Sequence, residues 1–149
     1  MTPDTRIPPT PLSLGLGGLL PFIALAAGAW LLPPPDSGLS ARYAAYYGAV
    51  ILSFVGALHW AFAMLLPIDE FDRGRVYGWS IAPALAAWLA LMLPTRAGLL
   101  LMAIMFLAHY AMDRRVARLA RLPAWYLRLR LWLTLGAIAS LLGTLPRAA

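Results

Sequence analysis

The stretch that decides the fold runs from Ala45 to Leu65 and reads AYYGAVILSFVGALHWAFAML. It is almost wholly apolar, yet it carries His59 near its end. An apolar run of about 20 residues is long enough to cross the hydrocarbon core of a bilayer as a helix. Because lipid offers no hydrogen bonds to the backbone, a segment that spans it is expected to be helical. We therefore predict a membrane-spanning helix with a histidine inside it.

The composition of the whole chain agrees with a membrane protein. Of 149 residues, 62% are hydrophobic, and the basic residues are twelve Arg with no Lys. A soluble domain of this size could not cover so much apolar surface. The Arg lie in short breaks between apolar runs, which does not indicate a nucleic-acid groove. The absence of Cys excludes disulfides, thiolate metal sites and a cysteine nucleophile.

Further apolar segments lie on both sides of the opening stretch, separated by breaks rich in Pro and charge. They cover about residues 12–32, 41–66, 76–93, 97–112 and 129–145. We predict an all-α membrane protein in which five transmembrane helices form one bundle and residues 1–149 form a single membrane domain. A retained first segment is preferred over a cleaved signal peptide.

The longest break, residues 113–128, is rich in Arg and reads DRRVARLARLPAWYLR. At helical spacing its Arg and apolar residues fall on different sides, which predicts a cytoplasmic amphipathic segment at the membrane interface. Each Arg near the surface attracts anionic lipid by about 1 kcal/mol. A protein-docking role is the alternative interpretation. The candidate lipid contacts are Arg114, Arg115, Arg118, Arg121, Trp125, Arg128 and Arg130.

The Arg distribution predicts an orientation. With five spans, one side of the membrane holds Arg6, Arg73, Arg75, Arg114, Arg115, Arg118, Arg121, Arg128 and Arg130. The other side holds Arg42, Arg96 and Arg147. The positive-inside rule places the N-terminus in the cytoplasm and the C-terminus in the periplasm of a bacterial inner membrane. A mitochondrial homologue would face the matrix instead.

Small residues recur at every fourth position of the second segment, which predicts close helix packing. They are Ala41, Ala45, Ala49, Ser53, Ala57 and Ala61. Small side chains let helix backbones approach each other within a bilayer. We expect this helix to lie at the centre of the bundle.

Unusual polar residues gather toward one leaflet. His59 lies about 10 Å inside the end of its segment, and His109 approaches the same end of the fourth segment. Asp113 stands four residues after His109, so the carboxylate and the imidazole share a helix side. The candidate ligand-binding residues are His59, Trp60, Trp79, Ser80, His109 and Asp113.

Two interpretations of these residues stay open. An ionisable group inside a membrane is functional by default, but a neutral histidine bonded to a neighbouring helix would also account for His59. His109 and Asp113 also fit an ion pair that closes a helix end. A quinone headgroup, a haem with two histidine ligands or a proton relay would suit the functional interpretation. No metal site is predicted, because the residues lack a characteristic ligand spacing, and Asp69, Glu70 and Asp72 fit a solvated, helix-capping turn.

Two of these stretches also resemble a known family. YYGAVILSFVGALHW and YGWSIAPALAAWLAL, with an Asp at the end of the fourth segment, resemble a bacterial inner-membrane family defined by a domain of unknown function, with mitochondrial relatives in the transmembrane protein 69 group. The matching positions are Tyr47, Gly48, Ser53, His59, Trp60, Trp79, Ser80, Pro83 and Asp113, whereas His109 is not part of the pattern. The resemblance implies a small multi-span protein of an energy-coupling membrane and an association with respiratory machinery.

Three functions follow as hypotheses. The leading one is a non-catalytic accessory or assembly subunit that associates with other membrane-protein subunits. The second is a ligand or redox site around His59 in the cytoplasmic leaflet. The third is an oligomeric channel or transporter, although the chain lacks the paired halves that many transporters show.

Overall fold

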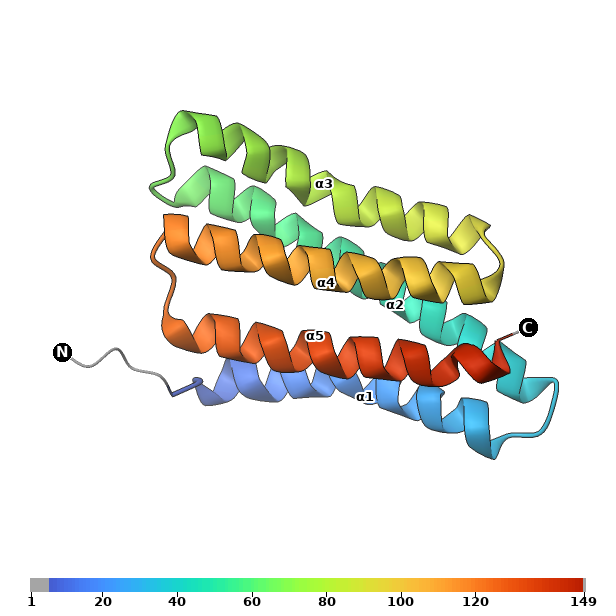
Figure 1. Cartoon of the computed structure of the whole chain (residues 1–149). Coiled ribbons are helices and arrows are strands. Elements are labelled where there is room, and N and C mark those ends of the chain that lie inside the picture. The colour runs from blue at the N-terminus through green and yellow to red at the C-terminus, as the bar shows by residue number, and fades with distance from the viewer. Residues whose placement is uncertain (1–5, 149) are drawn as a thin grey trace.

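The computed structural model describes residues 6–148. All regular secondary structure in this range is helical. The elements are α1 (Pro9–Leu31), α2 (Asp36–Leu65), α3 (Glu70–Met92), α4 (Thr95–Leu119), α5 (Ala124–Thr144) and a short 3-10 turn, η1 (Leu145–Arg147). At most four residues connect one α-helix to the next, and successive helices run in opposite directions (Figure 1). The start of α1 and the end of α5 therefore lie at opposite ends of the bundle. The predicted all-α fold is confirmed.

Proline and aspartate residues set where the helices begin. Pro8, Pro94 and Pro123 occupy the N-cap positions of α1, α4 and α5. Proline cannot donate a backbone hydrogen bond, so it marks the breaks between apolar runs. Asp69 caps α3, because its side chain accepts a hydrogen bond from the backbone N–H of Asp72 at 3.0 Å. The capping role predicted for this acidic turn is present.

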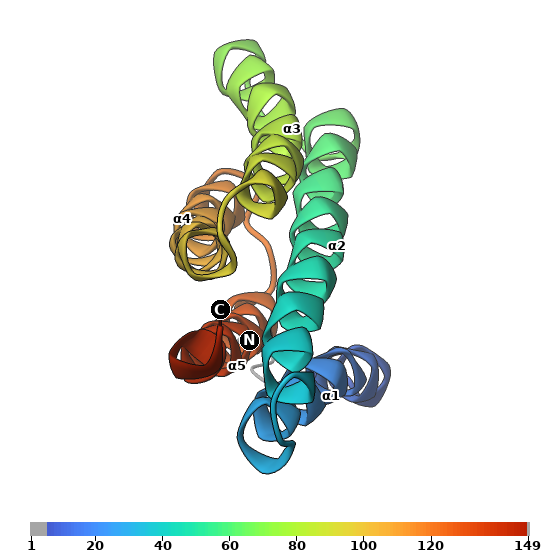
Figure 2. The same cartoon turned by 90° about the vertical axis from the view of Figure 1, so that its right-hand side faces the viewer.

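Helix α2 organises the bundle. It contacts each of the other four α-helices. In Figure 1 it runs diagonally, from beside α1 at its start to beside α3 at its end. Figure 2 shows α1 and α3 at opposite ends of this diagonal, with α4 and α5 along one side of it. The central position predicted for this helix is confirmed.

The stripe of small residues is buried over part of α2 rather than along all of it. Ala41, Ala45 and Ala49 are buried, whereas Ala57 is exposed. A spacing of four residues turns by 400°, so each step drifts about 40° around the helix at 3.6 residues per turn. Beyond Ala49 the buried face passes to other residues: Leu52, Val55, Gly56, His59 and Ala63.

Four helices are long and apolar enough to cross a membrane. They are α1, α2, α4 and the helix that begins with α5 and continues through η1. Helix α3 is not among them, and it begins with the charged residues Glu70, Asp72, Arg73 and Arg75. It nevertheless lies alongside α2 and α4, with which it makes extensive contacts (Figure 1). The chain is therefore a multi-pass membrane protein.

The predicted interfacial segment at residues 113–128 differs from the structure. Residues 113–119 form the last turns of α4, residues 120–123 form a short turn, and residue 124 begins α5. The reason is that the apolar side of this stretch packs inside the bundle, where Val116 and Ala117 are buried. Its Arg-rich side continues the surface of the helices instead of forming a separate element.

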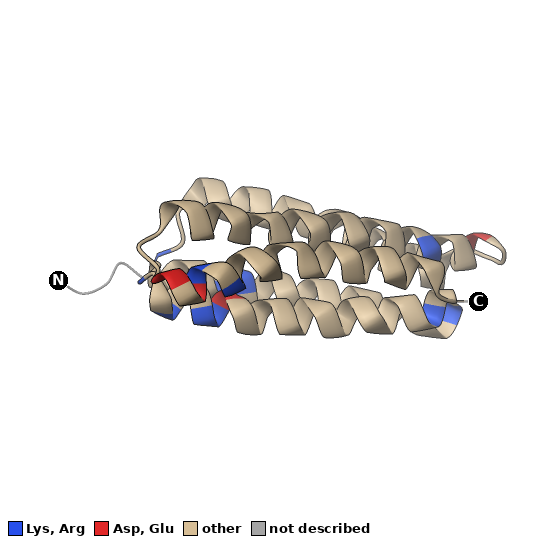
Figure 3. Ribbon diagram, turned by 90° about the horizontal axis from the view of Figure 1, so that it is seen from above, with Lys and Arg blue, Asp and Glu red and all other residues tan. Residues whose placement is uncertain are grey.

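Charged residues gather at the two ends of the bundle (Figure 3). One end, where α2 finishes and α5 begins, carries most of the Arg, and the stretch between the two ends is free of Asp, Glu and Arg over the described chain. This arrangement suits helices that cross a bilayer with their ends in the headgroup regions.

Candidate functional site

Polar side chains from three helices converge on Asp113, inside the Arg-rich end of the bundle. Asp113 lies about 9 Å before the end of α4, and His109 lies one turn earlier on the same helix. His59 comes from α2, and Tyr126 and Arg130 come from α5, one turn apart. We call these five residues the Asp113 cluster.

The Asp113 carboxylate is buried and fully engaged by helix α5. Its side chain is 1% exposed, and Oδ2 accepts a hydrogen bond from Nε of Arg130 at 2.6 Å. Oδ1 accepts a hydrogen bond from the hydroxyl of Tyr126 at 2.9 Å. A buried carboxylate is costly unless a cation and hydrogen-bond donors compensate it. Arg130 and Tyr126 supply both, so they fix α5 against α4.

The two histidines face the same carboxylate without bonding to it. Nε2 of His59 lies 3.6 Å from Oδ1 of Asp113, and Nε2 of His109 lies 3.9 Å from the same atom. Both distances exceed those of ordinary hydrogen bonds. Both imidazoles are fully buried, and no hydrogen bond of ordinary geometry reaches either ring nitrogen of His59 or Nε2 of His109, although the backbone carbonyl of Val55 lies near both rings. Leaving such a group unsatisfied costs about 1–3 kcal/mol. The cluster thus holds unused hydrogen-bonding capacity.

Trp79 of α3 determines the tautomer of His109. The indole N–H of Trp79 donates a hydrogen bond to Nδ1 of His109 at 3.1 Å. Nδ1 must therefore present a lone pair, and the proton of the neutral ring sits on Nε2, on the side of Asp113. Through this bond α3 also joins the cluster.

The arrangement favours hydrogen bonding over metal or haem ligation. His59, His109 and Asp113 bring three potential ligand atoms within 4.8 Å of one another. However, a ligating histidine normally donates its second N–H to an acceptor, whereas Nδ1 of His109 receives one from Trp79. The two imidazoles contact each other edge to face, with centroids 4.6 Å apart, so no porphyrin lies between them. The sequence predicts no metal site, and this stays a prediction.

Two of the predicted site residues neither belong to the cluster nor make a hydrogen bond to it. Trp60 is 51% exposed and packs edge to face on Tyr77. Ser80 is buried, but its hydroxyl donates to the backbone carbonyl of Tyr77 within the same helix. The structure brings together the other four predicted residues: His59, Trp79, His109 and Asp113.

Arg130 and Tyr126 belong to the site although sequence reasoning missed both. Arg130 was predicted to contact lipid, but it is buried and pairs with Asp113. The correction has a physical reason: α5 begins at Ala124 rather than near Leu129, so Arg130 lies inside the helix and not at its entrance. The spacing of four residues between the two polar side chains in an apolar helix was the available signal.

The other predicted lipid contacts lie at the Arg-rich end. Arg115 pairs with Asp72 of α3 at 2.5 Å, and Trp125 packs on Tyr126 with ring centroids 6.4 Å apart. The exposed members of the set are Arg114, Arg118, Arg121 and Arg128. Contact of these residues with anionic lipid stays a prediction.

Replacing Asp113 by Asn tests the buried ion pair. The variant keeps the shape of the side chain but leaves Arg130 buried without its counter-ion, so we expect it to lower the free energy of unfolding by about 3 kcal/mol or more. The control is Asp72→Asn, which disrupts the half-exposed pair with Arg115 and should cost less than about 1 kcal/mol. Unfolding in mixed detergent micelles measures both. Equal losses would contradict the assigned role.

Comparison with known proteins agrees with this architecture. Residues 7–146 match the family described as "Protein of unknown function (DUF3429)". Transmembrane protein 69 of Xenopus tropicalis is 36% identical over 152 residues, which cover 93% of this chain and 54% of that protein. The chain thus spans about half the length of this curated relative. No solved structure gives a significant match. The chain belongs to the DUF3429 family and is related to transmembrane protein 69.

Proposed function

We propose that this protein is non-catalytic and that it acts inside the membrane, through a proton-exchanging polar site formed by the Asp113 cluster. The observation that supports the proposal most strongly is the pair of buried imidazoles with unused nitrogens beside one carboxylate oxygen. If these residues served packing alone, the bundle would be more stable with every imidazole nitrogen hydrogen-bonded, or with the histidines replaced by apolar residues. Ionisable groups inside a membrane are conspicuously associated with proton and ligand pathways.

The geometry suggests how a proton is passed. His109 directs the proton on Nε2 toward Oδ1 of Asp113, and His59 directs its Nε2 toward the same atom. A shift of less than about 1 Å would bring either nitrogen into hydrogen-bond range. Arg130 and Tyr126 hold the carboxylate in place, and His59 is the ring that would carry the proton: as an imidazolium it would give its Nε2 proton to Oδ1 of Asp113 and be left neutral. His109 would orient its single ring proton toward the same oxygen and keep it, because its Nδ1 accepts from Trp79. Histidine is suited to this task, because an imidazole can both accept a proton and donate one.

Nitrogen NMR of histidine-labelled protein in lipid nanodiscs tests the site, since the chain has two histidines. We expect Nδ1 of His109 to be unprotonated at neutral pH while the protein stays folded, because that nitrogen accepts the indole N–H of Trp79. Asp113→Asn should alter the signals of both rings, and His59→Gln should leave one assignable set. Asp72→Asn is the control and should change neither ring. Ring signals of both histidines that are unchanged by Asp113→Asn would show that the histidines are packing residues.

An accessory or assembly subunit of a larger membrane complex, such as a respiratory complex, is the second candidate. The short connections favour it, because they leave little surface outside the helices for independent work. The exposed Arg114 and Arg118 would contact the acidic surface of a companion subunit or anionic lipid.

Purification from native membranes in mild detergent tests this candidate. We expect a stoichiometric companion that is lost when Arg114 and Arg118 are both changed to Glu, because reversed charges repel an acidic surface. Arg42→Glu, at the other end of the bundle, is the control and should retain the companion. Recovery of the free chain alone would contradict the candidate.

The proposed location is a bacterial inner membrane, crossed five times, with the Arg-rich end in the cytoplasm. Helix α3 would be the fifth span, since its charged residues stand in its first turns and its remainder is apolar. The N-terminus would then be cytoplasmic and the C-terminus periplasmic.

Labelling of single cysteines tests the five crossings, because the natural chain has no Cys. We expect Pro33→Cys and Pro94→Cys to react with an impermeant maleimide added from the periplasm. Pro67→Cys and Pro123→Cys should react in inverted vesicles. Reaction of positions 67 and 94 from the same side would show that α3 does not cross.

A further inference from the structure

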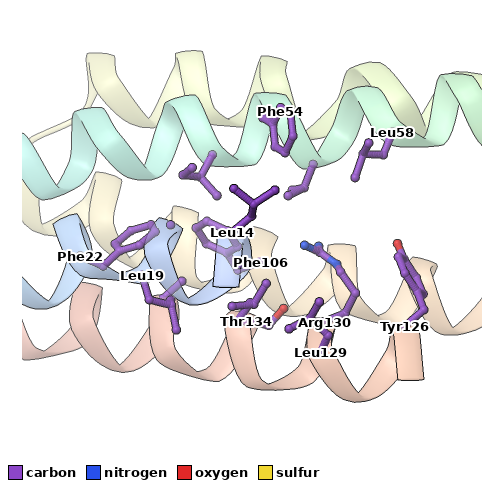
Figure 4. A pocket seen from close by; sticks show the side chains of 16 residues that line it. Leu14, Leu19, Phe22, Phe54, Leu58, Phe106, Tyr126, Leu129, Arg130 and Thr134 are labelled. Carbon is purple, nitrogen blue, oxygen red and sulfur yellow. The ribbon is translucent and has the colours of Figure 1, made fainter. Parts of the chain in front are cut away.

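A cavity of about 250 Å³ lies between α1, α2 and α5, next to the Asp113 cluster. Most of its wall is apolar and includes Phe22, Phe106 and Leu129 (Figure 4). Leu14 of α1 and Phe54 of α2 line it too, and both are strongly exposed, so the cavity opens to the outside of the bundle. In a multi-pass membrane protein that outside is lipid. The cavity is therefore reachable from the bilayer.

One end of the cavity is polar. Thr134, Arg130 and Tyr126 of α5 line it, and Figure 4 shows the guanidinium of Arg130 and the hydroxyl of Tyr126 pointing from α5 toward α2. The Thr134 hydroxyl has no hydrogen-bond partner although the residue is 3% exposed. Nε of Arg130 is bonded to Asp113, and its two terminal nitrogens carry four further N–H groups. This end offers donors to a ligand.

The charge of the site restricts the ligand. Arg130 is already neutralised by Asp113. An anionic headgroup would therefore leave the polar end with a net negative charge inside the membrane, which is costly. A neutral group that accepts hydrogen bonds carries no such cost. The rest of the wall suits an apolar chain.

We propose that this cavity binds a neutral amphipathic molecule whose carbonyl oxygen accepts hydrogen bonds from Arg130 and Thr134 and whose apolar chain leaves past Leu14 and Phe54 into the bilayer. The inference deepens the proposed function by naming a ligand class for the same site. A cavity of about 150 Å³ holds a benzene ring, so 250 Å³ suffices for a one-ring head and a few carbons of its chain. A lipid-soluble quinone and a diacylglycerol share this carbonyl chemistry.

Native mass spectrometry of the full chain in detergent tests the proposal with three probes: decyl-ubiquinone, dioctanoylglycerol and decanoate. We expect a one-to-one complex with decyl-ubiquinone, with dioctanoylglycerol or with both, and weaker binding of decanoate. Preference for one neutral probe identifies the source of the carbonyl. Binding of decanoate equal to that of the neutral probes would overturn the proposal.

Two glycines of α1 provide a matched pair of variants. Gly18 lines the cavity and Gly17 does not, and a Cβ at either position meets no atom within 4 Å. Gly18→Leu should fill the cavity and abolish the complex, whereas Gly17→Leu should bind as the natural chain does. Identical binding by the two variants would overturn the proposal.

Replacing Thr134 by Val tests whether the Thr134 hydroxyl recognises the carbonyl group of the ligand. The alternative is that the cavity only accommodates the ligand's apolar chain. The variant keeps the shape and removes the unpartnered hydroxyl, so the folded protein should be at least as stable as before. Binding of the neutral probe should fall about fivefold, as loss of one hydrogen bond predicts. Unchanged binding would overturn the assignment of Thr134.

The variant His59→Gln distinguishes this proposal from the proposed histidine site. It should still bind the neutral probe, because His59 does not line the cavity. The ligand site can therefore fail or hold independently of the histidine site.

Discussion

The bundle depends on the constraint that a carboxylate cannot be buried in a membrane protein without partners. Asp113 is buried in α4, and the partners that compensate it come from α5. Once Arg130 and Tyr126 reach the carboxylate, the axial position and rotation of α5 relative to α4 are fixed. His59 and Trp79 bring α2 and α3 to the same point. Asp113 thereby fixes α5 against α4, and the bond from Trp79 to His109 joins α3 to the same region, in an environment where apolar packing alone gives little direction.

The cluster is not optimised for stability, and this distinguishes it from a simple ion pair. The bond from Trp79 holds His109 in one tautomer, and two imidazoles remain close to Asp113 without reaching it. Next to the cluster, the cavity adds the unpartnered hydroxyl of Thr134. Unsatisfied polar atoms on both sides of Arg130 are costly to keep. Their position beside a lipid-accessible cavity is the feature on which both the proposed proton exchange and the proposed ligand site rest.

The sequence predicted the fold further than the site. Apolar runs and Pro-marked breaks predicted the helices, and the i, i+4 relation predicted that His109 and Asp113 share a side. The sequence could not reveal which helix faces Asp113, because a contact between two helices leaves no periodic signal within either segment. The sequence pattern predicts that Arg130 is a surface cation, because Arg near a segment end usually reaches water. Its burial depends on an anion of another helix, which a count of charges along the chain does not detect.

The most direct test of the central claim is a double-mutant cycle between Asp113 and Arg130, built from Asp113→Asn, Arg130→Gln and the double variant. If the pair is one buried unit, the double variant loses much less stability than the two single losses combined, with a coupling energy of about 2 kcal/mol or more in detergent unfolding. Losses that add to within about 0.5 kcal/mol would contradict the account, because independent residues behave in that way.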